Sequence, residues 1–167
     1  MRETSCSRSR LTHASKRCNP EDNMQGIAGV GHVAIKVTDL DRSLDYYRDR
    51  LGFPEMLRLF KDDGTCWLVY LRITDDQYLE VFPEGEGERA SEREAVGYNH
   101  MCLQVPDIEQ TVRELNEAGV EMIRPKVQGA DGNWQTWIED PDGHRIELMQ
   151  MAADSMQAQA IARLKGR

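Results

Sequence analysis

The stretch His32–Tyr47, HVAIKVTDLDRSLDYY, occurs a second time in this chain as His100–Leu115, HMCLQVPDIEQTVREL. At an offset of 68 residues the leading histidines align, and so do Asp39 and Asp107. In both copies a short alternating apolar run is followed by an acidic residue of the kind that caps a helix. The repeat therefore predicts a strand followed by a helix in each half of the chain.

A second pair of segments repeats in the same order. Gln77–Phe82 (QYLEVF) matches His144–Met149 (HRIELM) at an offset of 67 residues, which aligns Glu80 with Glu147. Two repeats in the same order indicate two copies of one module. Each copy contributes one His and one Glu at equivalent places.

The pattern between these landmarks predicts β-α-β-β-β twice, an α+β fold. In the first copy we expect a helix opened by Asp39 and strands at Gly31–Val37, Glu55–Phe60, Trp67–Ile73 and Gln77–Phe82. In the second we expect a helix at Asp107–Ala118 and strands at Tyr98–Val105, near Glu121–Arg124, at Trp134–Glu139 and at His144–Gln150. The predicted divisions are a disordered tail (1–26), a first module (27–82), a linker (83–95), a second module (96–151) and a C-terminal tail with a marginal helix (152–167).

Composition narrows the class of protein. The 167 residues are 40% hydrophobic and 30% charged, which is typical of a globular protein with a substantial core. The net charge of −8 argues against a nucleic-acid partner, and no apolar run is long enough to cross a membrane. The four cysteines show no CxxC spacing, so we expect free thiols in a cytoplasmic protein.

Strand alternation predicts where the repeated His and Glu side chains lie. Val33, Ile35 and Val37 share one face of the first strand and would pack on the helix, so His32 faces the other way. The same argument places Glu80, His100 and Glu147 on faces that point away from the helices. If the two modules pair about a pseudo-two-fold axis, these four side chains converge. Two imidazoles and two carboxylates suit one divalent transition metal ion, whose charge the carboxylates neutralise.

The sequence also resembles a known family. GHVAIKVTDLDRSLDYYRDRLGF, GYNHMCLQVPDIE and EDPDGHRIELMQ are similar to motifs of the vicinal oxygen chelate superfamily, which includes glyoxalase I (lactoylglutathione lyase), bleomycin resistance proteins and dioxygenases. The resemblance spans Gly29–Met151 and is strongest to the glyoxalase I branch. It implies a cupped, barrel-like mixed sheet with helices on its outer face, over a metal held by His32, Glu80, His100 and Glu147. The complete set of four argues against the metal-free antibiotic-binding members and the dioxygenases, which use two His and one Glu.

The resemblance further implies a mechanism. A substrate with adjacent oxygens binds the ion, the carbon-bound proton becomes acidic, and the ion stabilises the resulting enediolate. Glu147 is the first candidate for the base that moves the proton, with Glu80 as its partner. The ion is nickel, cobalt, manganese or zinc, one per site, because all four accept these ligands.

The substrate is where the chain departs from glyoxalase I. Lys36 and Glu84 stand where that family holds the carboxylates of glutathione with Arg and Asn, and Glu84 is a poor choice for holding an anion. The predicted substrate contacts are Lys36, Arg124, Lys126, Trp134 and Trp137, although the two tryptophans are equally suited to a core. Two alternatives to a glyoxalase I-like lyase stay open: an epimerase or isomerase for a non-thiol sugar or keto-acid derivative, and a non-catalytic binding or resistance protein.

The expected assembly is a homodimer that binds a small molecule. Two modules in one chain can pair with each other, or each can pair with the opposite module of a second chain. The linker permits both arrangements, and the resemblance favours the exchanged one.

Overall fold

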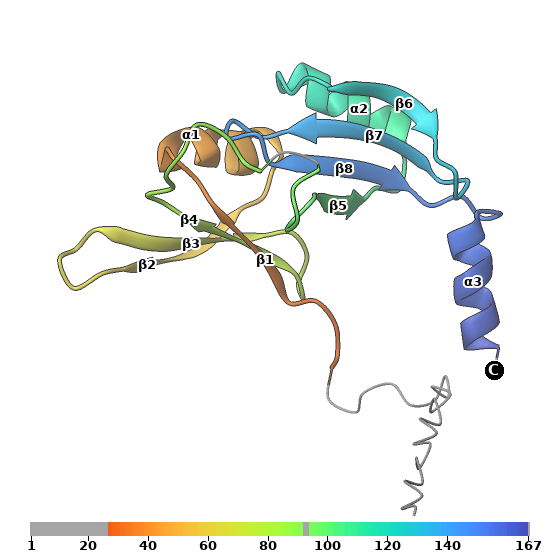
Figure 1. The fold of residues 1–167 in the computed structure, drawn as a ribbon, viewed down its shortest axis with the longest axis horizontal. Coiled ribbons are helices and arrows are strands. Elements are labelled where there is room, and N and C mark those ends of the chain that lie inside the picture. The colour runs from red at the N-terminus through yellow and green to blue at the C-terminus, as the bar shows by residue number, and fades with distance from the viewer. Residues whose placement is uncertain (1–26, 92–93, 167) are drawn as a thin grey trace, which may run out of the picture.

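The computed structural model describes residues 27–91 and 94–166, and these fold into two four-stranded mixed sheets with helices (Figure 1). The strand orders are β1-β4-β3-β2 and β5-β8-β7-β6, so the second sheet repeats the first. In each sheet the first and last strands of the module run parallel and the other pairs run antiparallel. The predicted α+β fold of two βαβββ modules is confirmed. Within the described residues the two sheets are separate and close no barrel. The predicted tail 1–26 lies outside the described part of the chain.

The elements follow the predicted order closely. The first module contains β1 (His32–Lys36), α1 (Leu40–Leu44) continued by the π-helix η1 (Asp45–Arg50), β2 (Glu55–Phe60), β3 (Cys66–Arg72) and β4 (Tyr78–Phe82). The second contains β5 (Met101–Gln104), α2 (Ile108–Glu117), β6 (Arg124–Gln128), β7 (Trp134–Glu139) and β8 (Arg145–Gln150), followed by α3 (Met156–Lys165). One strand differs from prediction: β6 begins at Arg124 rather than near Glu121, because regular pairing with β7 starts at the Arg124–Trp137 register.

The repeated aspartates start the two module helices. Asp39 accepts a hydrogen bond from the backbone N–H of Arg42, and Asp107 accepts the equivalent bond from Gln110, both at 3.0 Å. Each carboxylate thereby satisfies a backbone donor that has no partner within the helix. The equivalence of the modules thus extends to the way each helix begins.

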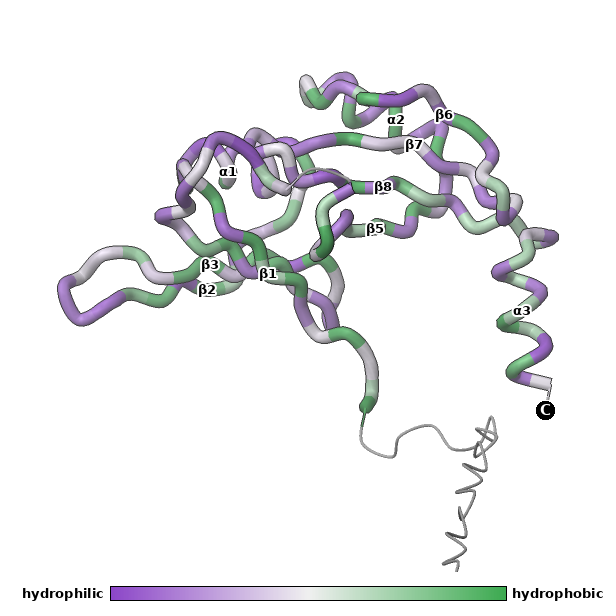
Figure 2. Tube along the Cα trace, in the orientation of Figure 1, coloured by the Kyte–Doolittle hydropathy of each residue, from purple (hydrophilic) through white to green (hydrophobic). Residues whose placement is uncertain are grey.

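One hydrophobic core spans both modules. It combines side chains from the two sheets, from α1 and η1, and from the segments after β1 and α2: Ile35, Val37, Leu44, Tyr46, Tyr47, Val69, Leu71, Leu79, Val81, Met101, Val120, Ile138, Ile146 and Leu148. Figure 2 shows hydrophobic residues along the strands and hydrophilic ones at the tip of the β2–β3 hairpin. The predicted alternation holds in β1, where Ile35 is buried while His32, Ala34 and Lys36 are exposed.

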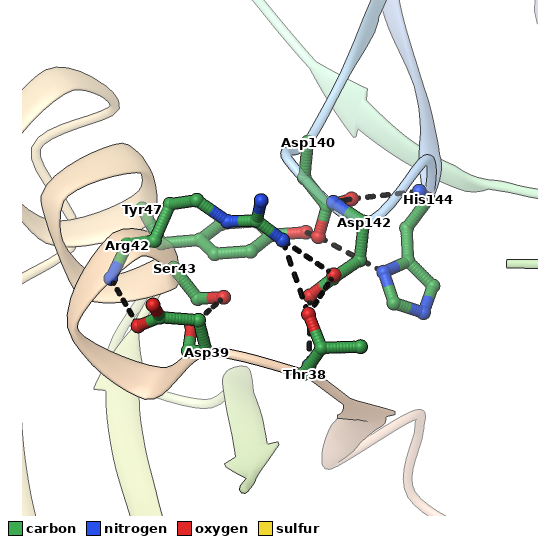
Figure 3. A network of polar contacts seen from close by, with 8 residues as sticks. All are labelled: Thr38, Asp39, Arg42, Ser43, Tyr47, Asp140, Asp142 and His144. Carbon is green, nitrogen blue, oxygen red and sulfur yellow. Dashed lines mark hydrogen bonds and ion pairs between the residues drawn. The ribbon is translucent and has the colours of Figure 1, made fainter. Parts of the chain in front are cut away.

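A polar network joins the modules beside this core (Figure 3). Asp140 and Asp142, in the turn between β7 and β8, are each 4% exposed. Asp140 accepts a hydrogen bond from the hydroxyl of Tyr47 and contacts the imidazole of His144, both at 2.9 Å. Asp142 pairs with Arg42 at 2.8 Å. The turn before the last strand of the second module is therefore tied to the first helical segment of the chain, α1 and η1.

Candidate metal centre

His32 and Glu80 form the first His–Glu pair. They lie on neighbouring strands, β1 and β4, and Nδ1 of His32 is 3.6 Å from Oε1 of Glu80. Glu80 is only 7% exposed, whereas half of the His32 side chain is accessible. Tyr70, directly across from Glu80 on β3, hydrogen-bonds its carboxylate, and this bond raises the pKa of the tyrosine. A buried carboxylate is thus held from one side by a hydroxyl and from the other by an imidazole.

His100 and Glu147 form the second pair. His100 immediately precedes β5, and its Nε2 lies 3.1 Å from Oε2 of Glu147 on β8. The other ring nitrogen, Nδ1, is 2.8 Å from the side-chain oxygen of Asn99. The ring also packs edge-on against Trp137, with centroids 4.7 Å apart. Cys102 is the cross-strand neighbour of Glu147; burial and that carboxylate raise the pKa of its thiol to about 11, so it is a thiol at neutral pH.

The structure brings these four residues together as two pairs, not as one cluster. Within residues 27–91 and 94–166, no three His, Cys, Asp or Glu side chains gather closely enough to hold a metal ion. His32 and His100 nevertheless line the same open groove, which has a volume of about 890 Å³. His32 lies on β1 and His100 lies immediately before β5. Each of these strands is at the end of its sheet and has one unpaired edge in the described structure.

The donor set still fits a divalent ion. Each pair presents one imidazole nitrogen and one carboxylate oxygen on the side of its sheet away from the core, and both carboxylates are largely buried. A carboxylate that is removed from water needs a compensating positive charge. One pair supplies too few ligands for a transition-metal site, and two pairs supply four.

The predicted substrate contacts divide between the two faces of the second sheet. Arg124 and Trp137 are cross-strand neighbours, and Trp137 is in turn directly across from Glu147, so both belong to the face of the metal pair. Lys126 instead pairs with Glu109 of α2 and lies over the ring of Trp134, at 4.6 Å from its centroid. Lys126 and Trp134 therefore lie on the helix-covered face, away from Glu147.

Two further residues, Tyr70 and Arg145, belong to the site face and were not predicted as site residues from the sequence. Tyr70 contacts Glu80. The repeat offset of 67 residues aligns Tyr70 with Trp137, which was a predicted substrate contact, so the repeat could have identified Tyr70 as a site residue. Arg145 lies two residues before Glu147 on β8 and donates a hydrogen bond to the backbone carbonyl of Asn99 at 3.0 Å. Lys36, which was predicted, is exposed on β1 and lines a pocket of about 350 Å³ that Arg145 also lines.

Comparison with known proteins gives consistent matches. The sequence model of the Glyoxalase/Bleomycin resistance protein/Dioxygenase superfamily matches residues 29–148. A lactoylglutathione lyase of Neisseria meningitidis serogroup A is 28% identical over 71% of this chain and 88% of its own length. An ethylmalonyl-CoA/methylmalonyl-CoA epimerase of Cereibacter sphaeroides is also 28% identical, over 75% of this chain and 99% of its own length.

Solved structures agree with the fold. A glyoxalase family protein from Enterococcus faecalis superimposes with a TM-score of 0.65 at 29% identity, covering 73% of this chain and 97% of that one. In the described residues, none of the helices has the length and apolar character needed to span a membrane.

Proposed function

Because the chain belongs to the glyoxalase/bleomycin resistance protein/dioxygenase superfamily, we propose that it is a divalent-metal-dependent lyase or isomerase. Its reaction is the movement of a proton on a 2-hydroxycarbonyl compound or a hemithioacetal. The observation that carries this proposal is the presence of two His–Glu pairs at repeat-equivalent positions, on the same face of two equivalent sheets.

The proposed site is built between two copies of the chain. An unpaired strand edge favours association with another strand, and both β1 and β5 have such an edge. Setting β1 of one copy beside β5 of the other would join His32 and Glu80 to the partner copy's His–Glu pair. Symmetry would create two such sites in a homodimer. The separation of the pairs within one chain supports this arrangement.

The two carboxylates have different surroundings, which suggests different roles. When bound, the divalent ion (nickel, cobalt, manganese or zinc) would supply the positive charge that acidifies the carbon-bound proton of the substrate. Glu80 is held by the hydroxyl of Tyr70, which suits a fixed ligand. Glu147 lies beside Trp137 and His100 and is about 17% exposed, so it is better placed to take a proton from one carbon and return it to the next.

The second candidate function within this class is an epimerase acting on a non-thiol acid. Glu84, which stands where glyoxalase I places a residue that holds glutathione, forms an ion pair with Lys61 at 2.6 Å. A carboxylate at that place disfavours an anionic glutathione tail. The epimerase from Cereibacter sphaeroides is as similar to this chain as the lyase.

Metal analysis tests the site and does not require a known substrate. Purified protein should contain one divalent ion per chain, and His100→Ala should lose most of it while keeping the circular dichroism of the wild type. The matched control is His144→Asn, a histidine outside both pairs, which should retain the metal. Full metal content in the folded His100→Ala protein would refute the site.

Solvent exchange tests the reaction. In D₂O the metal-loaded enzyme should introduce deuterium next to the carbonyl of a 2-hydroxycarbonyl compound, and a non-catalytic binding protein should introduce none. Hemithioacetals of glutathione and short hydroxy acids should be compared in parallel, because exchange in only one class separates the lyase from the epimerase. Metal binding without exchange in either class would support the binding-protein alternative.

A further inference from the structure

Two arginines on the face of Glu147 have no carboxylate partner in the described part of the chain. Elsewhere the described arginines of the first module and linker all form ion pairs: Arg42, Arg48, Arg50, Arg58, Arg72 and Arg89. Arg145 lies directly across from Glu139, which would be its natural cross-strand partner, but Glu139 pairs with Arg89 at 2.6 Å. The guanidinium of Arg124 lies over the ring of Trp137, with its carbon 5.7 Å from the centroid.

These two arginines line one small cleft together with Trp137, Asn99 and Ile123. Its volume of about 20 Å³ has room for one small polar group and not for a whole substrate. The cleft adjoins the second His–Glu pair, because Trp137 packs against His100 and is the cross-strand neighbour of Glu147. A group bound there would therefore lie close to the reacting atoms.

We propose that this cleft binds a carboxylate of the substrate between Arg124 and Arg145. The inference rests on the proposed function, and it makes the substrate a 2-hydroxycarbonyl compound that carries a carboxylate near the reacting carbon. Two guanidinium groups without acidic partners leave a positive charge that an anion neutralises. Arginine presents paired N–H donors that match the two oxygens of a planar carboxylate.

The position of Arg145 places the cleft next to the proposed base. Two residues along a strand span roughly 7 Å, so the Cα atoms of Arg145 and Glu147 are about that far apart. A short keto or hydroxy acid fits this spacing. The carboxylates of a glutathione conjugate lie many bonds from the reacting carbon and do not. Lys36, which shares the neighbouring pocket with Arg145, adds positive charge to the same region.

The test observes the indole N–H signals of the full-length protein by ¹⁵N NMR, after its metal has been removed with a chelator. The probes are lactate, its uncharged methyl ester and inorganic phosphate. Lactate should shift the Trp137 signal, identified with Trp137→Phe, in a saturable way, and methyl lactate should not. Trp134, on the opposite face of the sheet, serves as the internal reference. Arg124→Gln and Arg145→Gln should each weaken lactate binding about tenfold or more, since a hydrogen bond to a charged group contributes about 1.5–3 kcal/mol.

The matched control is Arg113→Gln, an exposed arginine of α2 outside the cleft, which should bind lactate like the wild type. Equal shifts with lactate and methyl lactate, unchanged binding in both arginine variants, or saturable binding of phosphate without lactate would each overturn the carboxylate assignment. Because metal is absent, failure of the metal site does not affect this result. A protein that binds metal and exchanges solvent deuterium but shows no lactate shift would refute this inference alone.

Discussion

Asp142 accepts two hydrogen bonds from Thr38, one from the backbone N–H at 3.1 Å and one from the hydroxyl at 2.6 Å. The residues are 104 positions apart and belong to different modules. Asp142 is nearly buried and also pairs with Arg42. Its carboxylate therefore fixes the turn before β8 against the residues that start the first helix, and so helps to orient one half-site relative to the other.

Removing this carboxylate should destabilise the protein. Asp142→Ala leaves the N–H of Thr38 and the guanidinium of Arg42 without their acceptor, so we expect a loss of about 2–4 kcal/mol in the free energy of unfolding. Urea denaturation measures it. Asp75→Ala is the control, because its ion pair with Arg72 is on the surface and should contribute little. Equal denaturation midpoints for Asp142→Ala and the wild type would contradict the role of the network.

Two adjacent tyrosines should respond oppositely to the same substitution. The hydroxyl of Tyr47 is buried and donates to Asp140, so Tyr47→Phe should cost about 1–2 kcal/mol. The hydroxyl of Tyr46 is buried and has no hydrogen-bond partner in the described residues, so Tyr46→Phe should leave stability unchanged or increase it. The two denaturation midpoints should move apart relative to the wild type. A greater loss for Tyr46→Phe would show that its hydroxyl has a partner.

His144 should make the stability depend on pH. Its hydrogen bond to Asp140 raises the pKa of the imidazole above the ordinary value of about 6.5. The folded protein therefore binds the proton more tightly than the unfolded chain does. This contribution is fully present below the unfolded pKa and is lost as pH rises through the folded one. The wild type should exceed His144→Asn in urea midpoint at pH 6. This difference should shrink toward pH 8, as the pH rises through the pKa of His144 in the folded protein. A difference that grows with pH would reverse the assignment.

The repeat made most of the fold predictable. The aligned histidines and aspartates indicated a strand and a capped helix in each module, and both helices are capped by those aspartates. The position of β6 was predicted less well, because Val120 and Met122 have apolar side chains that pack in or against the core although they have no place in the register with β7. The π-helical turns after α1 were not predictable from apolar spacing, which hardly differs over a single turn.

The site was predictable only in part. Alternation along strands predicted that the repeated His and Glu share a face in each module, and the structure brings them together as one pair in each sheet. Alternation is a local rule, so it could not show whether the two sheets of one chain face each other. The same limit applies to Lys126, whose face depends on the irregular register at the start of β6 and on Glu109 of α2.

Replacing the proposed base should affect activity more than metal content. Gln keeps an oxygen that can contact a metal but cannot accept the proton, so Glu147→Gln should lose about 10²–10⁴ in rate. Deuterium exchange into the substrate measures the rate, and elemental analysis of the same sample measures the metal. Glu80→Gln should instead lose metal together with activity. Wild-type exchange by metal-loaded Glu147→Gln would move the base to another residue, with Glu80 the first to test.

Metal binding by mixed variants tests the shared centre most directly. His32→Ala and His100→Ala each damage every site of a homodimer, so each protein alone should bind little metal. A mixed dimer would have one site with both lesions and one site with neither. After subunit exchange is demonstrated, the mixture should regain metal at about a quarter of all sites, as random pairing requires. Continued absence of metal in the exchanged mixture, or stoichiometric metal in a monomeric wild type, would contradict a centre shared between two chains.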